Sequence, residues 1–221
     1  PDNPRALYAF SRVLMFMFSF EEAETLLTAV PGASDLILYQ YAFGTLYYML
    51  DDMPAVEKSF NRAIHLTTEP DVQHRLKSRL NLFLARFEEA AAEAKKCLQL
   101  DPQDFEAWTI LSDALAGMAQ IKPAREAVYK AFDIYPRSTP VQLRLLISLF
   151  SEDRKDDFFP FLEEKAPELL SFDGNISKLV DLLQVEDDPM LPVWLLGNMV
   201  EREPNNPEVH TAIGFLLAEI E

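Results

Sequence analysis

The stretch ARFEEAAAEAKKCLQLDP, residues 85–102, has the composition of an amphipathic helix that runs into a proline. Similar stretches occur at 19–31 (SFEEAETLLTAVP), 52–66 (DMPAVEKSFNRAIHL) and 121–136 (IKPAREAVYKAFDIYP). Each has an aromatic or aliphatic residue, a smaller residue three places later, and two more apolar residues before a break. A single helix does not need to repeat itself, so the pattern predicts several helices that stack on one another.

The repeat has a nearly constant period. The small residues Ala23, Val56, Ala90 and Ala124 are spaced by 33, 34 and 34 residues. Two further lines keep the same step, one of them Val30, Ala63, Cys97 and Ala131, the other Ser11, Gly44, Ser78 and Ser112. A fixed period in this range is typical of a solenoid, and its register argues against the alternative of an irregular helical bundle.

Residues 105–138 show how one repeat is built. A first helical stripe is followed by a break at 117–121 and by a second stripe, which Pro136 closes. The pattern Trp108, Leu111, Ser112, Leu115, Ala124, Val128, Ala131 and Pro136 resembles the tetratricopeptide repeat, a helix–turn–helix unit. The resemblance implies an all-α, right-handed superhelical solenoid.

The resemblance covers nearly the whole chain. The expected repeats are 4–36, 37–70, 71–104, 105–138, 139–172 and 173–206, followed by a half repeat, 207–221. It is weakest at 139–172, where Phe158 and Lys165 occupy small-residue places. In 71–104 the polar residues His74, Lys77 and Asn81 fall at places that the family keeps apolar. We therefore expect the first helix of that repeat to be slid by one or two positions.

Both ends read as junctions between repeats. PDNPRALY at the start parallels PNNPEVHT at 204–211, and the last stretch matches a first helix without its partner. Solenoids need polar caps at their ends, so we expect a fragment of a longer array. The helix expected at 208–220 carries too many apolar residues for one face, which suggests either self-association through it or cover by a missing helix.

Composition narrows the function. The formal net charge of −16 has the wrong sign for nucleic acid. The longest uncharged run, 36–50, is too short to span a membrane, and no signal peptide is visible. We therefore expect a soluble protein without direct membrane insertion, cytoplasmic rather than periplasmic.

The sequence contains none of the common catalytic motifs. A Gly-rich phosphate loop, a His-Glu-x-x-His motif and a cysteine pair are all missing. Cys97 stands where the repeat places a small buried residue, and His74 and His210 share one repeat place that favours packing over metal ligation. We expect no enzyme, no cofactor and no metal site.

The first helices of the repeats carry a candidate binding surface. In the family that the chain resembles, these helices line the concave face, and peptides or partner proteins bind there. The outward places of these helices combine aromatic or polar residues with basic ones, as interface hot spots do. They are Tyr8, Arg12, Tyr41, Thr45, Tyr48, Arg75 and Arg79. For Tyr48, packing between neighbouring repeats is an equal alternative. Some members of that family bind C-terminal carboxylates with Lys, Asn and Arg at set places, and this sequence does not have that set of residues at the matching places.

The resulting expectation is a non-enzymatic protein–protein interaction scaffold that binds a peptide or partner protein in its concave groove. The alternative is a regulatory or anchoring segment of a larger enzyme, or of a bacterial envelope or secretion machine, whose chemistry lies outside these residues.

Overall fold

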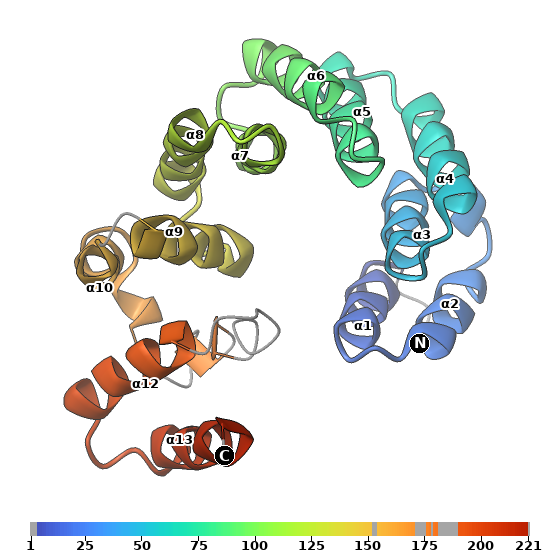
Figure 1. The fold of residues 1–221 in the computed structure, drawn as a ribbon. Coiled ribbons are helices and arrows are strands. Elements are labelled where there is room, and N and C mark those ends of the chain that lie inside the picture. The colour runs from blue at the N-terminus through green and yellow to red at the C-terminus, as the bar shows by residue number, and fades with distance from the viewer. Residues whose placement is uncertain (1–3, 152–153, 171–175, 178, 181–189, 221) are drawn as a thin grey trace. The chain divides into compact units, whose positions relative to one another are not determined.

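A computed structural model describes residues 4–151, 154–170, 176–177, 179–180 and 190–220. The chain forms two compact units, Pro1–Ala124 and Arg125–Glu221, which we treat separately. Every regular element among the described residues is a helix, and none of those residues is in a strand (Figure 1). The all-α prediction is confirmed.

The N-terminal unit consists of helices that pack in consecutive pairs. The pairs are α1 (Pro4–Phe16) with α2 (Phe20–Thr28), α3 (Ile37–Met49) with α4 (Met53–Leu66), and α5 (Pro70–Phe83) with α6 (Phe87–Leu100), followed by α7 (Phe105–Gly117) and the start of α8 (Ile121–Ile134). Helices α1, α3, α5 and α7 form one layer, and α2, α4 and α6 form the other (Figure 1). The first helices of successive pairs therefore share one face.

Small residues let the two layers approach closely. Gly44 is buried, and a Cβ atom added there would lie 2.5 Å from the ring of Phe60. Ser78 is fully buried and donates its hydroxyl to the carbonyl oxygen of Ala90 at 2.8 Å. A large residue at either place would separate the helices of the pair.

The expected slide of the helix in 71–104 is wrong. Ser78 is buried at the same 34-residue step that separates it from Gly44 and Ser112, which are buried as well. Only the start of the helix differs: α5 begins at Pro70, 33 residues after the start of α3 at Ile37, which is one residue short of the 34-residue step. Proline is well tolerated in a first helical turn, so the segment before α5 can end there without displacing the buried residues.

The turn inside each pair has a residue in the left-handed conformation. These residues are Phe18, Asp51, Ala85 and Ala119, with φ between 53° and 59°, and none of them is glycine. The conformation recurs with the repeat because each turn must reverse the chain over the same short distance. A side chain there costs roughly 1–2 kcal/mol, which the packing of the paired helices offsets.

The C-terminal unit contains α9 (Thr139–Ser151), α10 (Phe158–Lys165), α12 (Met190–Arg202) and α13 (Pro207–Ile220). Phe158 is fully buried at its small-residue place, whereas Lys165 is exposed and reaches Asp133 at 3.4 Å. The first helix expected in 173–206 falls mostly outside the described residues.

On α13, Val209 and Leu216 are buried and Phe215 is 66% exposed, while the side chains beyond Leu216 lie outside the described set. None of the helices described is long and apolar enough to cross a membrane.

Candidate functional site

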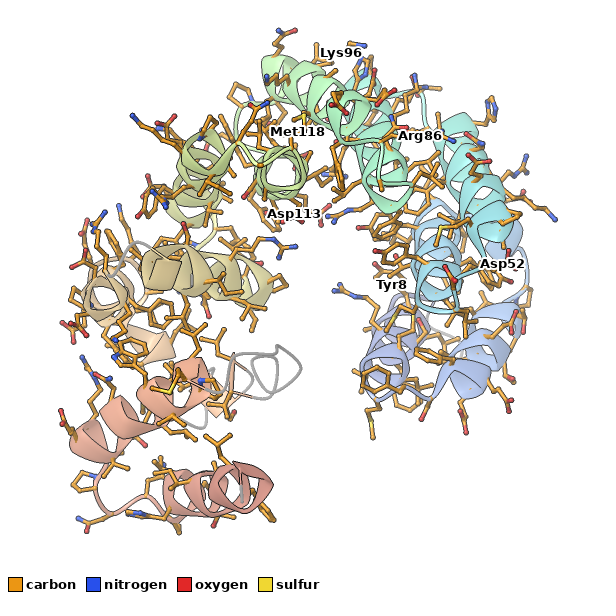
Figure 2. The ribbon with its side chains drawn as sticks, viewed as in Figure 1. Tyr8, Asp52, Arg86, Lys96, Asp113 and Met118 are labelled. Atoms are coloured by element: carbon orange, nitrogen blue, oxygen red, sulfur yellow. The ribbon has the colours of Figure 1, made fainter. Side chains whose placement is uncertain are left out.

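The candidate site is the face that α1, α3 and α5 turn away from α2, α4 and α6, which we call the first-helix face. In Figure 2, Tyr8 and Asp113 lie on this side of the N-terminal unit, and Lys96 lies on the opposite side, on α6. Among the predicted residues, Arg12 and Tyr48 are exposed, whereas Tyr8, Tyr41, Thr45, Arg75 and Arg79 are half-buried. The layered fold explains why residues so far apart in sequence share this face.

Residues from three helices act on the hydroxyl of Tyr8. Burial raises the pKa of Tyr8, Arg12 lowers it, and Tyr41 and Glu106 raise it further. Tyr8 and Arg12 come from α1, Tyr41 from α3 and Glu106 from α7. The first-helix face thus brings cationic, phenolic and acidic groups within electrostatic reach of one another.

Aromatic rings connect neighbouring pairs. Tyr41 meets the ring of Phe60 edge-on at 5.5 Å between centroids, and Tyr48 stacks on Phe83 of α5 at 4.1 Å with only 10° between the planes. Tyr48 nevertheless remains 42% exposed. It therefore packs between repeats with part of its surface and leaves the rest accessible.

Arg75 is half-buried and bound to two carboxylates. Its Nη1 donates to Oδ2 of Asp104 at 2.7 Å, and its Nε lies 3.6 Å from Oε2 of Glu106. Burial alone would lower the pKa of Arg75, but Asp104 and Glu106 outweigh it and raise the pKa. Because its charge is already matched, Arg75 positions α5 against α7 and contributes little charge for a ligand.

Arg79 and Thr45 differ in whether their hydrogen-bond donors have partners. The guanidinium of Arg79 lies 6.0 Å from the centre of the Phe83 ring, and its buried Nε finds no hydrogen-bond partner within the described part of the chain. The hydroxyl of Thr45 donates to the carbonyl oxygen of Tyr41 at 2.9 Å. The donor of Thr45 is therefore used within α3, whereas the Nε of Arg79 is buried without a partner among the described residues.

The residues considered for chemistry have structural partners. Cys97 is fully buried, and burial together with Asp104 raises the pKa of its thiol to about 12. His74 contacts Glu93 through Nδ1 at 2.7 Å, and His210 contacts the carbonyl oxygen of Pro204 at 2.9 Å. The described residues contain no group of three or more His, Cys, Asp or Glu side chains that could hold a metal ion.

Sequence reasoning missed two features. One is Asp104, which caps α7 through the amide of Ala107 at 2.9 Å while it binds Arg75. Its place before Phe105 is a signal for an N-cap, but the arginine partner lies too far away in sequence to be recognised. The other is a polar pocket beside Lys77 and Asn81, residues whose polarity was interpreted as a shifted helix.

Comparison with known proteins agrees with this architecture. The model of the tetratricopeptide repeat family matches residues 76–104. No match was found among curated proteins.

Several solved structures are similar. TTC0263, a tetratricopeptide-repeat protein of Thermus thermophilus, has a TM-score of 0.53 at 15% identity, over 83% of this chain and 100% of that one. PilF of Pseudomonas aeruginosa has a TM-score of 0.53 at 13% identity, over 94% and 95% of the two chains. A chain of the Cut9–Hcn1 hetero-tetramer of the APC/C has a TM-score of 0.56 at 10% identity, over 98% of this chain and 43% of its own. At these identities the similarity concerns the fold alone.

Proposed function

We propose that this chain, a tetratricopeptide-repeat protein by its fold and by the family match at 76–104, is a protein-interaction scaffold whose first-helix face binds a segment of a partner protein. The observation that carries the proposal is Tyr48. Its ring is fixed by stacking on Phe83 at 4.1 Å and is still 42% exposed. A rigid aromatic surface that remains accessible loses little conformational entropy on binding, which is the property of an interface anchor.

The charges on the face favour a particular kind of segment. Arg75 is neutralised by Asp104 and Glu106, so Arg12 and Arg79 are the two predicted cations without an ion pair among the described residues. We infer that the bound segment carries an apolar or aromatic side chain against Tyr48 and an acidic group toward these arginines. The overall net charge of −16 disfavours the binding of acidic segments elsewhere on the surface. An acidic segment should therefore bind selectively beside Arg12 and Arg79.

The test begins with a selection of random displayed peptides on the immobilised chain, followed by fluorescence anisotropy with the enriched peptides. Arg12→Glu should weaken binding by about 1–3 kcal/mol if the contact is desolvated, roughly 5- to 150-fold in Kd. Tyr41→Ala and Tyr48→Ala should also weaken it, because they remove apolar contact area.

The matched control is Lys95→Glu, the same charge reversal at an exposed position of α6 in the other layer. It should leave Kd unchanged. If the enriched peptides bind Arg12→Glu and Tyr41→Ala as tightly as the original chain while circular dichroism shows an intact fold, the binding surface lies elsewhere and the proposal fails.

A further inference from the structure

A second candidate site lies between α4 and α6, with α5 beneath it. The structure has a pocket of about 740 Å³ there. The polar side chains that line it include Lys77 and Asn81 from α5, Asn61 and His65 from α4, and Glu93 and Lys96 from α6. Lys96 lies on the side of the unit opposite Tyr8 (Figure 2), so this pocket is separate from the first-helix face.

The pocket exists because one repeat departs from its neighbours. Its α5 carries His74, Lys77 and Asn81 where the adjacent repeats, 34 residues away in either direction, carry Gln40, Phe43 and Tyr47 or Trp108, Leu111 and Leu115. Leu111 and Leu115 are each 5% exposed, and Phe43 packs against a buried cluster. At the places of Lys77 and Asn81 the adjacent repeats carry apolar or aromatic side chains, whereas α5 carries polar ones that line the pocket.

Part of the polar lining is already satisfied within the protein. Glu93 accepts a hydrogen bond from Lys96 at 2.6 Å and contacts Nδ1 of His74 at 2.7 Å. Burial alone would raise the pKa of Glu93, but these two neighbours lower it, so Glu93 stays ionised with its charge matched. Glu89, which also lines the pocket, is exposed to solvent.

Three further donor side chains of the pocket are unpaired among the residues that the structure describes. Within the part of the chain that the structure describes, the ammonium group of half-buried Lys77 has neither a hydrogen bond nor an ion pair, and the side-chain amides of Asn61 and Asn81 have no hydrogen bond. Asn61 is exposed, whereas Lys77 and Asn81 are half-buried, so an acceptor bound in the pocket would replace water that solvates these donors. A carboxylate is the acceptor that best suits one ammonium and neighbouring amide donors.

We propose that this pocket is a binding site for a carboxylate, held by the charge of Lys77 and by the amides of Asn61 and Asn81. The carboxylate could belong to a small organic acid or to an acidic side chain of a peptide, since both present the same group. The sequence supports a ligand-binding role because Lys77 occupies a place at which an apolar residue would pack, as Phe43 and Leu111 do.

The test is a titration followed by amide chemical shifts in two-dimensional ¹H–¹⁵N NMR. The probes are glutarate, the tripeptide acetyl-Gly-Glu-Gly-amide, and acetyl-Gly-Gln-Gly-amide as the neutral counterpart. Saturable shifts confined to α5 and the facing turns of α4 and α6 are expected with a carboxylate probe and not with the glutamine tripeptide. Saturation by glutarate alone identifies a small acid as the ligand, and saturation by the glutamate tripeptide identifies an acidic side chain.

The decisive variant is Lys77→Leu, which restores the residue type of the neighbouring repeat. It should keep or raise the unfolding midpoint and weaken carboxylate binding at least about tenfold, a factor that corresponds to one lost charged contact. Lys77→Gln, which keeps a polar side chain, should weaken binding as well. The matched control Lys95→Leu, at an exposed position of α6, should leave binding unchanged. Equal shifts with the glutamine tripeptide, no saturable shift with either acid, or unchanged binding by both Lys77 variants would overturn the proposal.

Discussion

Replacing Arg75 with methionine should destabilise the N-terminal unit, because it leaves the carboxylate of Asp104 buried without its cation. The Asp104 side chain is 4% exposed, and its Oδ2 lies 2.7 Å from Nη1 of Arg75. Removing one member of a buried ion pair typically costs 3–5 kcal/mol. The Arg75 side chain is 31% exposed, and Asp104 keeps its bonds to Ala107 and Cys97. We therefore expect a loss of about 2–3 kcal/mol, which lowers Tm by roughly 4–12 °C in a chain of this size.

The assay is thermal and urea unfolding followed by circular dichroism, with Arg79→Met as the matched control. Arg79 lies one turn later on α5 and forms no ion pair within the described residues; its guanidinium contacts the ring of Phe83 at 6.0 Å. Its replacement should cost less than about 1 kcal/mol. In the double variant Arg75→Met with Asp104→Asn, the loss should be clearly smaller than the sum of the two single losses. Equal losses for Arg75→Met and Arg79→Met, or strict additivity in the double variant, would refute the reasoning.

Three further predictions concern the same unit. Ala85→Gly should stabilise the fold by about 0.5–1 kcal/mol because it relieves a φ of 53°, whereas Ala92→Gly at an exposed position inside α6 should destabilise it by a similar amount; urea unfolding that gives both variants the same sign contradicts this. Cys97, whose burial raises the thiol pKa to about 12, should react with Ellman's reagent at pH 8 only as fast as the unit unfolds, and native labelling at the rate seen in urea would show that the thiol is accessible. The pKa of Glu93 is lowered against burial by Lys96 and His74, so the stabilisation is present above the ordinary glutamate pKa and disappears as the pH falls through the lowered one. Lys96→Met should consequently cost about 0.3–1 kcal/mol at pH 7 and nothing at pH 2, and an equal cost at both values would contradict this origin.

The helical pairs could be predicted from the sequence because their packing is local and periodic. Close approach of two helices requires a small residue at a fixed place, and Ser11, Gly44, Ser78 and Ser112 meet that requirement as buried residues. The sequence also carries signals for helix starts that the prediction did not use, because Asp52 and Asp104 are N-caps and proline lies in the first turns of α4 and α5. The all-α fold follows from these signals alone.

The contacts within the candidate site could not be predicted in the same way. Arg75 was assigned to a binding surface from its outward place, but its partner Asp104 is 29 residues away and caps α7, the first helix of the next repeat. The period of a repeat shows which residues share a face and does not show which side chains meet across two repeats. The stacking of Tyr48 on Phe83 could not be predicted for the same reason, because the two rings come from different repeats.

The polar places on α5 show the opposite error. His74, Lys77 and Asn81 conflicted with the apolar pattern of the family, and a shifted helix was the simplest way to remove the conflict. In the structure the register of α5 is unchanged. Lys77 and Asn81 line a pocket, and His74 contacts Glu93, which also lines it. Departure from the pattern at one repeat therefore coincides with a pocket rather than with an irregular helix.

The most direct test of the central claim is photo-crosslinking from the first-helix face in the cells from which the protein comes. A benzophenone amino acid is placed at Tyr41 or Tyr48, and as a control at exposed Lys95 in the other layer. The proposed function predicts that both first-helix positions crosslink to the same segment of the same protein, that Arg12→Glu reduces the yield, and that the position of Lys95 gives no such product. Crosslinks of equal yield from all three positions, or from Lys95 alone, would contradict it.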